Sequence, residues 1–324
     1  MQSRTAGMVT FSDIEAAAEV LRPVAHRTPL LSSRTFNNLT ANEVYFKAEN
    51  FQRVGAFKFL GAYNKIHSLS EADRRKGIIA HSSGNHAQGV ALAAKLHDIK
   101  AVVVMPHNSV AMKVEATKGY GAEVVFCEDS TDDRERVTAE LIEKHGYALI
   151  HPYNDEKLIA GQGTAGAEIF HDLKDLDYLF VPVGGGGLIS GCAVAVKNIY
   201  PSVSVIGVET EGADDACRSF SAGKIVKIPK AVTIADGMRT LSVGPLNFDI
   251  MKKYVDDMIT IPDPAIFPMM RFFIDRMKII VEPTGAVAPA AVMADVLKLR
   301  GKKIAAIISG GNADPEILRK AMTG

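Results

Sequence analysis

Four consecutive glycines form the most distinctive candidate site in the sequence. Gly184 to Gly187 follow the apolar run Val181-Pro182-Val183 and precede an apolar segment of helical character. Glycine lets the backbone approach an anion closely, and free N–H groups at a helix start attract negative charge. We therefore predict a phosphate site, with a plain strand-to-helix turn as the alternative. The glycines do not form GxGxxG, but Glu209 lies about 22 residues beyond Gly187, so a nicotinamide-dependent dehydrogenase remains a rival interpretation.

Two further loops place polar groups where apolar runs end. The segment His81-Ser-Ser-Gly-Asn-His86 puts hydroxyls, an amide and free N–H groups at one helix start, which suits a carboxylate. A helix cap with extra polar residues is the alternative. The segment Ile307 to Asn312 also ends in a hydroxyl and two glycines. Ligands of open α/β sheets bind where parallel strands end, so the three loops together indicate one site.

Lys58 is a candidate nucleophile. It stands between Phe57 and Phe59, where desolvation lowers the pKa of the amine and makes its neutral form accessible. The alternative is an ordinary solvated surface lysine, which is the more frequent case for a lysine taken alone.

Short runs rich in β-branched residues alternate with segments whose apolar residues have helical spacing. These strands and helices must position the loops. We predict strands at Glu43–Lys47, Ile78–His81, Ala101–Met105, Glu123–Phe126, Leu149–His151, Tyr178–Val183, Val203–Glu209 and Lys303–Ser309, and helices at His86–Leu96 and Val110–Gly119. Strands alternating with helices indicate parallel sheets and an α/β fold.

Composition narrows the class of protein. The 324 residues carry 37 Lys+Arg against 37 Asp+Glu, which argues against a nucleic-acid binder. At this length a chain forms two lobes with a cleft between them. The three scattered cysteines and the lack of an apolar N-terminal stretch predict a cytoplasmic protein. The long uncharged run Tyr178–Val196 is interrupted by Pro182 and the glycines, so no membrane association is expected.

Together these segments resemble the fold-type II pyridoxal-phosphate (PLP) enzymes, specifically the family of serine racemases, serine/threonine dehydratases and threo-3-hydroxyaspartate dehydratases. The matching stretches follow the family order and cover nearly the whole chain: Glu49–Phe59, Ser82–Gln88, Ala160–Thr164, Pro182–Leu188, Arg276–Thr284 and Ser309–Asn312. Leu60 departs from the family, which commonly has arginine there. The resemblance implies a tryptophan synthase β-like α/β fold of open twisted sheets with helices on both faces. It also implies a small mobile domain at residues 54–150 and a large PLP-binding domain at 1–53 and 151–324.

The resemblance implies roles for single residues at the cofactor. Lys58 would form the Schiff base with PLP and later remove the substrate α-proton, while Ser83 is the second catalytic candidate, on the opposite side of the α-carbon. The implied cofactor contacts are Phe57, Lys58, Asn85, Gly184, Gly185, Gly186, Gly187, Gly237 and Ser309. The Ser309 hydroxyl at the pyridine nitrogen does not enforce a protonated ring, which favours elimination at the β-carbon.

Substrate and metal contacts follow from the same resemblance. The implied substrate contacts are Ser82, Ser83, Asn85, His86, Arg134 and Thr240. Arg134 would pair with a second carboxylate, such as that of 3-hydroxyaspartate, and an exposed helix arginine is the alternative. Glu209, Ala213 and Asp215 would supply oxygen ligands for Mg, Mn or Ca, with an acidic surface turn as the alternative.

The sequence therefore predicts a PLP-dependent ammonia-lyase. It would convert a small β-hydroxy-α-amino acid of the 3-hydroxyaspartate, serine or threonine class to a 2-oxo acid and ammonia, as a homodimer. The main alternative is a serine racemase with elimination as a side reaction. A non-catalytic phosphate-binding protein that kept the fold is a third possibility.

Overall fold

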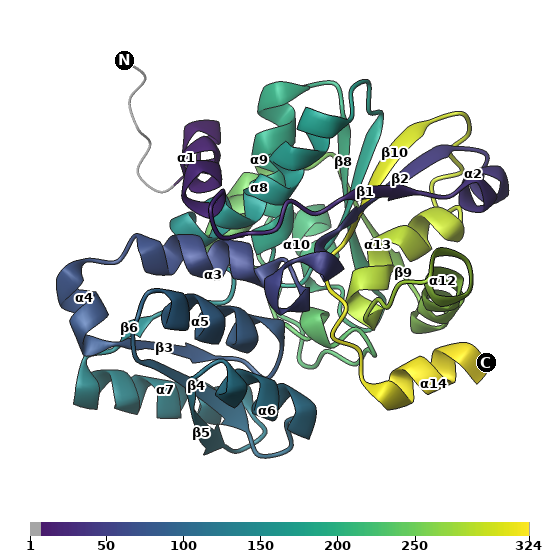
Figure 1. Ribbon diagram of the computed structural model, residues 1–324. Helices are drawn as coiled ribbons and strands as arrows, with labels where there is room; N and C mark the ends of the chain where they lie inside the picture. The colour runs from purple at the N-terminus through teal and green to yellow at the C-terminus, as the bar shows by residue number, and fades with distance from the viewer. Residues whose placement is uncertain (1–7, 324) are drawn as a thin grey trace.

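The computed structural model describes residues 8–323, and its strands form two sheets (Figure 1). The six-stranded sheet has the order β1-β2-β10-β7-β8-β9, and the four-stranded sheet has the order β5-β4-β3-β6. Neighbouring strands run parallel except β1 and β2, which are antiparallel. The strands are β1 (Leu30–Ser32), β2 (Glu43–Ala48), β3 (Ile78–His81), β4 (Ala101–Pro106), β5 (Glu123–Cys127), β6 (Ala148–Leu149), β7 (Tyr178–Pro182), β8 (Ser204–Thr210), β9 (Asp257–Ile261) and β10 (Lys303–Ile308).

Helices fill the connections between these strands, precede β1 and follow β10. They are α1 (Phe11–Leu21), α2 (Arg34–Thr40), α3 (Lys58–His67), α4 (Glu71–Lys76), α5 (Asn85–Leu96), α6 (Ala111–Gly119), α7 (Thr131–His145), α8 (Glu156–Asp172), α9 (Gly187–Ile199), α10 (Asp215–Ala222), α11 (Pro245–Tyr254), α12 (Ile266–Phe272), α13 (Pro283–Met293) and α14 (Pro315–Thr323). Single turns lie at η1 (Glu49–Phe51), η2 (Arg53–Gly55), η3 (Asp236–Met238), η4 (Asp263–Ala265) and η5 (Phe273–Met277). The α/β fold with helices on both sheet faces is confirmed.

The predicted strands agree with the observed ones to within one or two residues. The largest difference is the strand predicted at Leu149–His151, which is the two-residue β6 at Ala148–Leu149. The residues that follow, Pro152 and Tyr153, line the cleft described below. Strands β1 and β9, the edge strands of the six-stranded sheet, were not predicted. Edge strands are half-solvated and lack the continuous apolar run of a buried parallel strand.

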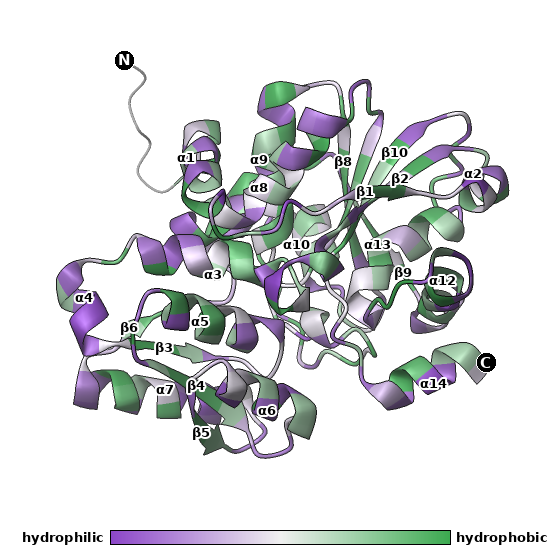
Figure 2. Ribbon diagram, in the orientation of Figure 1, coloured by the Kyte–Doolittle hydropathy of each residue, from purple (hydrophilic) through white to green (hydrophobic). Residues whose placement is uncertain are grey.

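Alternate residues of the six-stranded sheet pack on two different helix layers. In β7, Leu179 and Val181 join the core that includes α8 and α9, whereas Phe180 joins the core that includes α12 and α13. This alternation follows from the two-residue period of a strand. Figure 2 shows the contrast with α4, which is hydrophilic except at Ala72 and buries none of its residues.

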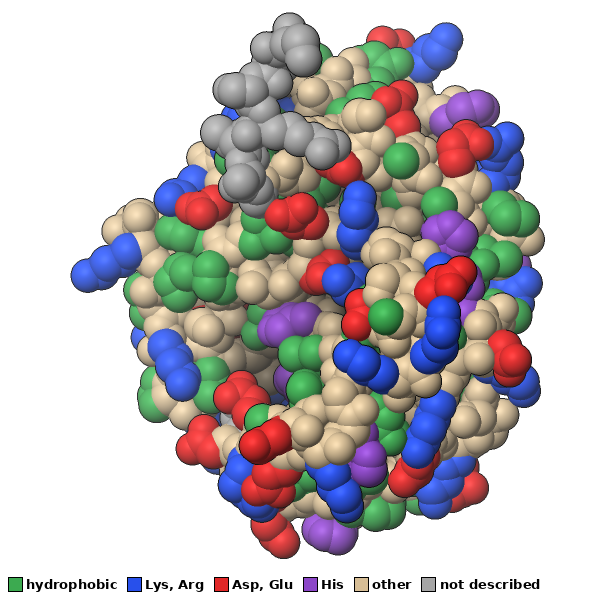
Figure 3. All heavy atoms as spheres, turned by 90° about the vertical axis from the view of Figure 1, so that its left-hand side faces the viewer, with side chains coloured by type: hydrophobic (Ala, Val, Ile, Leu, Met, Phe, Trp, Pro, Cys, Tyr) green, Lys and Arg blue, Asp and Glu red, His purple; other side chains and the backbone are tan. Residues whose placement is uncertain are grey.

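Neither sign of charge dominates the face drawn in Figure 3. Figure 3 shows basic and acidic side chains interspersed over the face that lies on the left of Figure 1. Among residues 8–323, no helix is both long enough and apolar enough to cross a bilayer.

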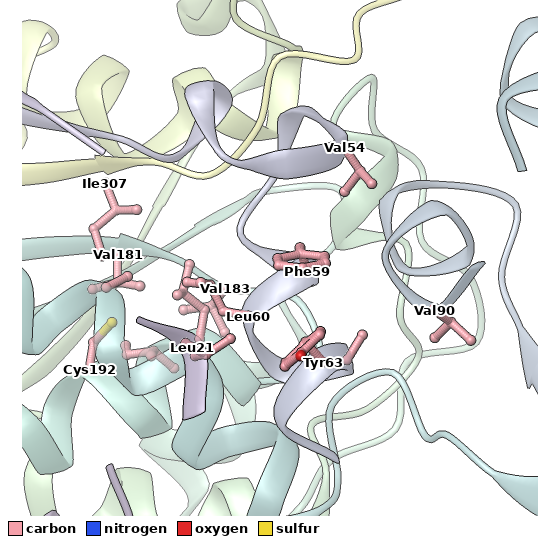
Figure 4. Packing of buried hydrophobic residues seen from close by; sticks show 14 of the residues in the cluster. Leu21, Val54, Phe59, Leu60, Tyr63, Val90, Val181, Val183, Cys192 and Ile307 are labelled. Atoms are coloured by element: carbon pink, nitrogen blue, oxygen red, sulfur yellow. The ribbon is translucent and has the colours of Figure 1, made fainter. Parts of the chain in front are cut away.

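Helix α3 is held firmly in the core and begins at the lysine singled out above. Phe59, Leu60 and Tyr63 on this helix join a buried cluster that includes Leu21 and Val183 (Figure 4). Phe59 is fully buried and Leu60 is 2% exposed. The first residue of α3, Lys58, is therefore carried by a rigid element.

Candidate active site

A cleft of about 490 Å³ is lined by segments from both sheets. It brings together every residue predicted to contact cofactor or substrate: Phe57, Lys58, Ser82, Ser83, Asn85, His86, Arg134, Gly184, Gly185, Gly186, Gly187, Gly237, Thr240 and Ser309. The loops that follow β3, β7 and β10 all meet here, as expected of an open α/β sheet. The three predicted metal ligands do not line this cleft.

The glycine loop forms a cradle of free N–H groups. Gly184 to Gly187 lead from β7 into the 13-residue helix α9, and none of their four N–H groups donates a hydrogen bond to another described residue. A Cβ added at Gly184 would lie 2.7 Å from the carbonyl oxygen of Gly237, so a side chain would fill the cradle. Free N–H groups at the positive end of a helix dipole suit a phosphate, so this loop fits the phosphate group of PLP.

Lys58 presents its amine in the wall of the cleft. Its Nζ donates a hydrogen bond of 2.8 Å to the carbonyl oxygen of Pro152 and lies 5.2 Å from the centre of the Phe57 ring. Burial lowers the pKa of Lys58 to about 8, although the nearby Glu282 carboxyl partly opposes this shift. A fraction of the amine is therefore neutral and nucleophilic near neutral pH.

Ser309 lies beside this lysine at the end of β10. The N–H of Phe57 donates to the carbonyl oxygen of Ser309 at 3.1 Å, which fixes the two loops together. Ser309 is only 2% exposed, and its Oγ has no hydrogen-bond partner in the described structure. Buried hydroxyls are normally paired, so this one suits a ring nitrogen supplied by a ligand.

Asn85 belongs to a partly buried chain of polar groups that the sequence did not reveal. Its Nδ2 donates to Glu282 Oε1 at 2.6 Å, and its Oδ1 accepts from Asn312 Nδ2 at 2.9 Å. Burial, with a contribution from Asp236, raises the pKa of Glu282 to about 7. Glu282 lay inside a matching stretch, but only its contacts identify it as a cleft residue.

The start of α5 offers donors for a carboxylate. The N–H groups of Ser83, Asn85 and His86 donate to no described residue, whereas the Gly84 N–H bonds to Ser82 Oγ at 3.2 Å. His86 Nε2 lies 2.9 Å from the Ile150 carbonyl oxygen, which only accepts, so Nε2 carries the hydrogen. Burial, aided by Lys58, lowers the pKa of His86 well below its usual range and keeps the ring neutral.

Arg134 lies across the cleft on α7. Its Nε is buried and has no hydrogen-bond partner among the described residues. Arg136, two residues on, is by contrast paired with Asp133 and Glu140 at the surface. Burial and then the Arg134 charge lower the pKa of His81, which also lines the cleft. An unpaired guanidinium in a cleft is suited to an anionic ligand group.

The predicted metal ligands form a separate buried group. Glu209, Ala213 and Asp215 are fully buried, and both carboxylate oxygens of Asp215 lack a hydrogen-bond partner in the described structure. Burial, then Asp215, raises the pKa of Glu209, and burial, then Asp214, raises that of Asp215 to about 7. No group of three or more His, Cys, Asp or Glu in residues 8–323 could hold a metal. The two Asp215 oxygens without a partner nevertheless fit a cation completed by other oxygens, whereas the Glu209 carboxylate already accepts from the N–H groups of Ala216 and Cys217.

Two further cleft features went unnoticed in the sequence. Lys113 of α6 forms an ion pair with Asp236, the residue before Gly237, and thereby joins the segments of the two sheets. Tyr153 packs against the glycine loop, since a Cβ added at Gly185 would lie 2.2 Å from its ring. Both contacts join residues far apart in the chain, and no local pattern signals them.

Comparisons with known proteins agree with this geometry. A family model described as "Pyridoxal-phosphate dependent enzyme" matches residues 21–310. The chain is 45% identical to an L-threo-3-hydroxyaspartate ammonia-lyase of Saccharomyces cerevisiae, over 94% of both chains. It is 46% identical to a serine racemase of Schizosaccharomyces pombe, over 95% of both chains. The structure of maize serine racemase superposes with a TM-score of 0.93 at 41% identity, and 97% of each chain is covered. The chain belongs to the family of pyridoxal-phosphate dependent enzymes.

Proposed function

We propose that the protein is a PLP-dependent ammonia-lyase that prefers 3-hydroxyaspartate among β-hydroxy-α-amino acids. The substrate loses its α-proton and β-hydroxyl as water, and hydrolysis of the dehydrated product yields a 2-oxo acid and ammonia. The observation that carries the preference is the unpaired Nε of Arg134 in the cleft wall. Similarity to two L-threo-3-hydroxyaspartate ammonia-lyases, from Saccharomyces cerevisiae and a Pseudomonas species, supports the reaction class.

Each group of cleft residues has its own role in this reaction. When bound, PLP withdraws electron density from the α-carbon and so acidifies its C–H bond. The free N–H groups of Ser83, Asn85 and His86 at the start of α5 bind the α-carboxylate. Lys58, with a pKa of about 8, accepts the α-proton at near-neutral pH. The glycine loop holds the cofactor by its phosphate, and Ser309 meets the ring nitrogen.

Arg134 is assigned to the β-carboxylate. A guanidinium binds a carboxylate through two parallel charge-assisted hydrogen bonds, which serine and threonine cannot offer at the β-carbon. Losing such a contact costs about 1.5 to 3 kcal/mol, so Arg134→Met is expected to lower kcat/KM for L-threo-3-hydroxyaspartate about 10- to 100-fold. Turnover of L-serine should change by less than about threefold, because it lacks the second carboxylate.

The test measures 2-oxo acid release from the PLP-loaded enzyme with L-threo-3-hydroxyaspartate, L-serine and L-threonine. Arg136→Met on the same helix is the matched control, since Arg136 is exposed and already paired. It should leave all three rates unchanged. An equal loss of all substrates in Arg134→Met would remove Arg134 from the specificity role and leave the ammonia-lyase assignment intact.

A serine racemase is the second candidate, favoured by the free hydroxyl of Ser83 in the cleft and by the Schizosaccharomyces pombe relative. If Ser83 delivers a proton to the opposite side of the α-carbon, Ser83→Ala should retain elimination and lose D-serine formation from L-serine. Chiral analysis of serine recovered from the reaction separates the two candidates. D-serine formation faster than ammonia release would favour the racemase.

We also propose a divalent cation, Mg, Mn or Ca, at the Glu209 and Asp215 carboxylates, with the Ala213 carbonyl as a further ligand. The two orphaned oxygens of Asp215 support this assignment. Oxygen-only ligands suit these hard cations.

The remaining expectations concern the assembly and its setting. We propose that residues 54–150 form a small mobile domain against a large domain of 1–53 and 151–324. The four-stranded sheet, whose strands lie between Ile78 and Leu149, supports this division.

A homodimer is the simplest symmetric assembly. The three free cysteines fit a reducing cytoplasm.

A further inference from the structure

Gln162 lies in the interior beneath the glycine loop. It is part of α8, which packs so tightly on α9 that a Cβ added at Gly163 would lie 2.7 Å from the carbonyl oxygen of Gly191. The side chain of Gln162 is 0% exposed. A Cβ added at Gly187 would lie 2.5 Å from Gln162 Oε1, so the carboxamide contacts the first residue of α9.

Both ends of this carboxamide are unsatisfied. Neither Nε2 nor Oε1 of Gln162 has a hydrogen-bond partner in the described structure. Buried polar groups are nearly always paired, and leaving one unpaired is destabilising. A leucine would fill similar volume without that penalty. The polar side chain is therefore matched to a partner that arrives at the glycine loop with a ligand.

Asn247 shows how an amide nitrogen can hold the same loop, although its Oδ1 also lacks a partner in the described structure. Its Nδ2 donates to the carbonyl oxygens of Gly185, at 2.9 Å, and Tyr153, at 3.1 Å. It thereby fixes the loop from the side of α11. Gln162 lies against Gly187 from the side of α8, with its hydrogen-bonding capacity unused.

We propose that Gln162 is a positioning residue of the phosphate site. Its carboxamide supports the first turn of α9 by contact at Gly187, so that the loop N–H groups face the phosphate, and its Nε2 hydrogens add positive potential beneath the anion. This inference rests on the proposed PLP dependence. It assigns Gln162 to the phosphate alone and not to the pyridine ring or the substrate.

The test compares two ligands that differ only in the phosphate. The full chain is freed of cofactor and titrated with PLP or with pyridoxal, and binding is followed by the absorbance of the ring. Gln162→Leu should raise the Kd of PLP about tenfold or more and change the Kd of pyridoxal by less than about twofold. The melting temperature of the cofactor-free chain should not fall below that of the wild type, because the substitution removes unpaired buried polar groups and breaks no hydrogen bond.

Thr164→Val is the matched control, because it removes another buried polar group of α8 whose hydroxyl already bonds to the Gly161 carbonyl oxygen at 2.7 Å. It should leave both Kd values unchanged. Equal weakening of PLP and pyridoxal, or no weakening of PLP, overturns the role of Gln162. If Gln162→Leu does not fold, Gln162→Met decides in the same way, since it keeps the length of the side chain and removes only its hydrogen-bonding groups. A wild-type chain that binds neither ligand would instead refute the proposed function.

Discussion

Lys58 gives a prediction that runs against the usual effect of removing an active-site residue. The structure lowers the pKa of this amine from 10.5 to about 8, so the cofactor-free protein holds a charge that the fold disfavours. A pKa difference of about 2.5 corresponds to about 3 kcal/mol of folding free energy. Lys58→Met removes that penalty but also leaves the Pro152 carbonyl oxygen unpaired, which costs about 1 kcal/mol. The net gain at pH 7 is about 2 kcal/mol.

The pH dependence of wild-type folding stability sets the direction in which the advantage of Lys58→Met changes with pH. Below pH 8 the amine is protonated in both folded and unfolded states, and the folded state bears the full penalty. Between pH 8 and 10.5 the unfolded state binds more protons than the folded state, so wild-type stability rises with pH. The advantage of Lys58→Met should therefore shrink in that window.

Urea unfolding of the cofactor-free proteins at pH 7 and pH 9.5 measures both effects. Lys224→Met, at an exposed position, is the control and should change stability by less than about 0.5 kcal/mol. A Lys58→Met protein that is no more stable than wild type at pH 7 would refute the reasoning. A gain of equal size at both pH values would show that desolvation of the amine is not its source.

Two other perturbations test the outlying parts of the site. Addition of Mg²⁺ should raise the melting temperature of the wild type but not that of Asp215→Asn. The control Asp249→Asn, at an exposed position, should behave like the wild type. An equal rise in all three proteins would place the cation elsewhere. Lys113→Met breaks the pair with Asp236, so amide exchange should accelerate in residues 78–149 and not in the six-stranded sheet. Lys118→Met on the same helix is its exposed control, and uniform acceleration would argue against a separately mobile unit.

The parts of the site whose residues are neighbours in the chain could be predicted from the sequence. The glycine loop, the start of α5 and the end of β10 each combine an apolar strand with polar or glycine residues directly after it. Lys58 was recognised because its neighbours Phe57 and Phe59 imply a desolvated amine. The edge strands β1 and β9 of the six-stranded sheet were missed because their apolar pattern is short or mixed with polar residues, as in Asp257–Ile261.

The remaining features depend on long-range contacts. Glu282 becomes a cleft residue only through Asn85, which lies far away in the chain. Gln162 was part of a matching stretch, yet its unsatisfied amide is visible only where α8 meets α9. Whether an arginine is paired also depends on the residues around it in the folded chain. On α7, Arg136 pairs with Asp133, whereas the Nε of Arg134 has no partner in the described structure. No spacing rule distinguishes them.

The most direct test of the central claim is a parallel measurement of ammonia and oxaloacetate from L-threo-3-hydroxyaspartate, using the PLP-loaded wild type and Lys58→Ala. Dehydration followed by hydrolysis releases the two products in equal amounts, so we expect equimolar release by the wild type and none by Lys58→Ala. Substrate that is consumed without ammonia, or release that persists in Lys58→Ala, would contradict the account.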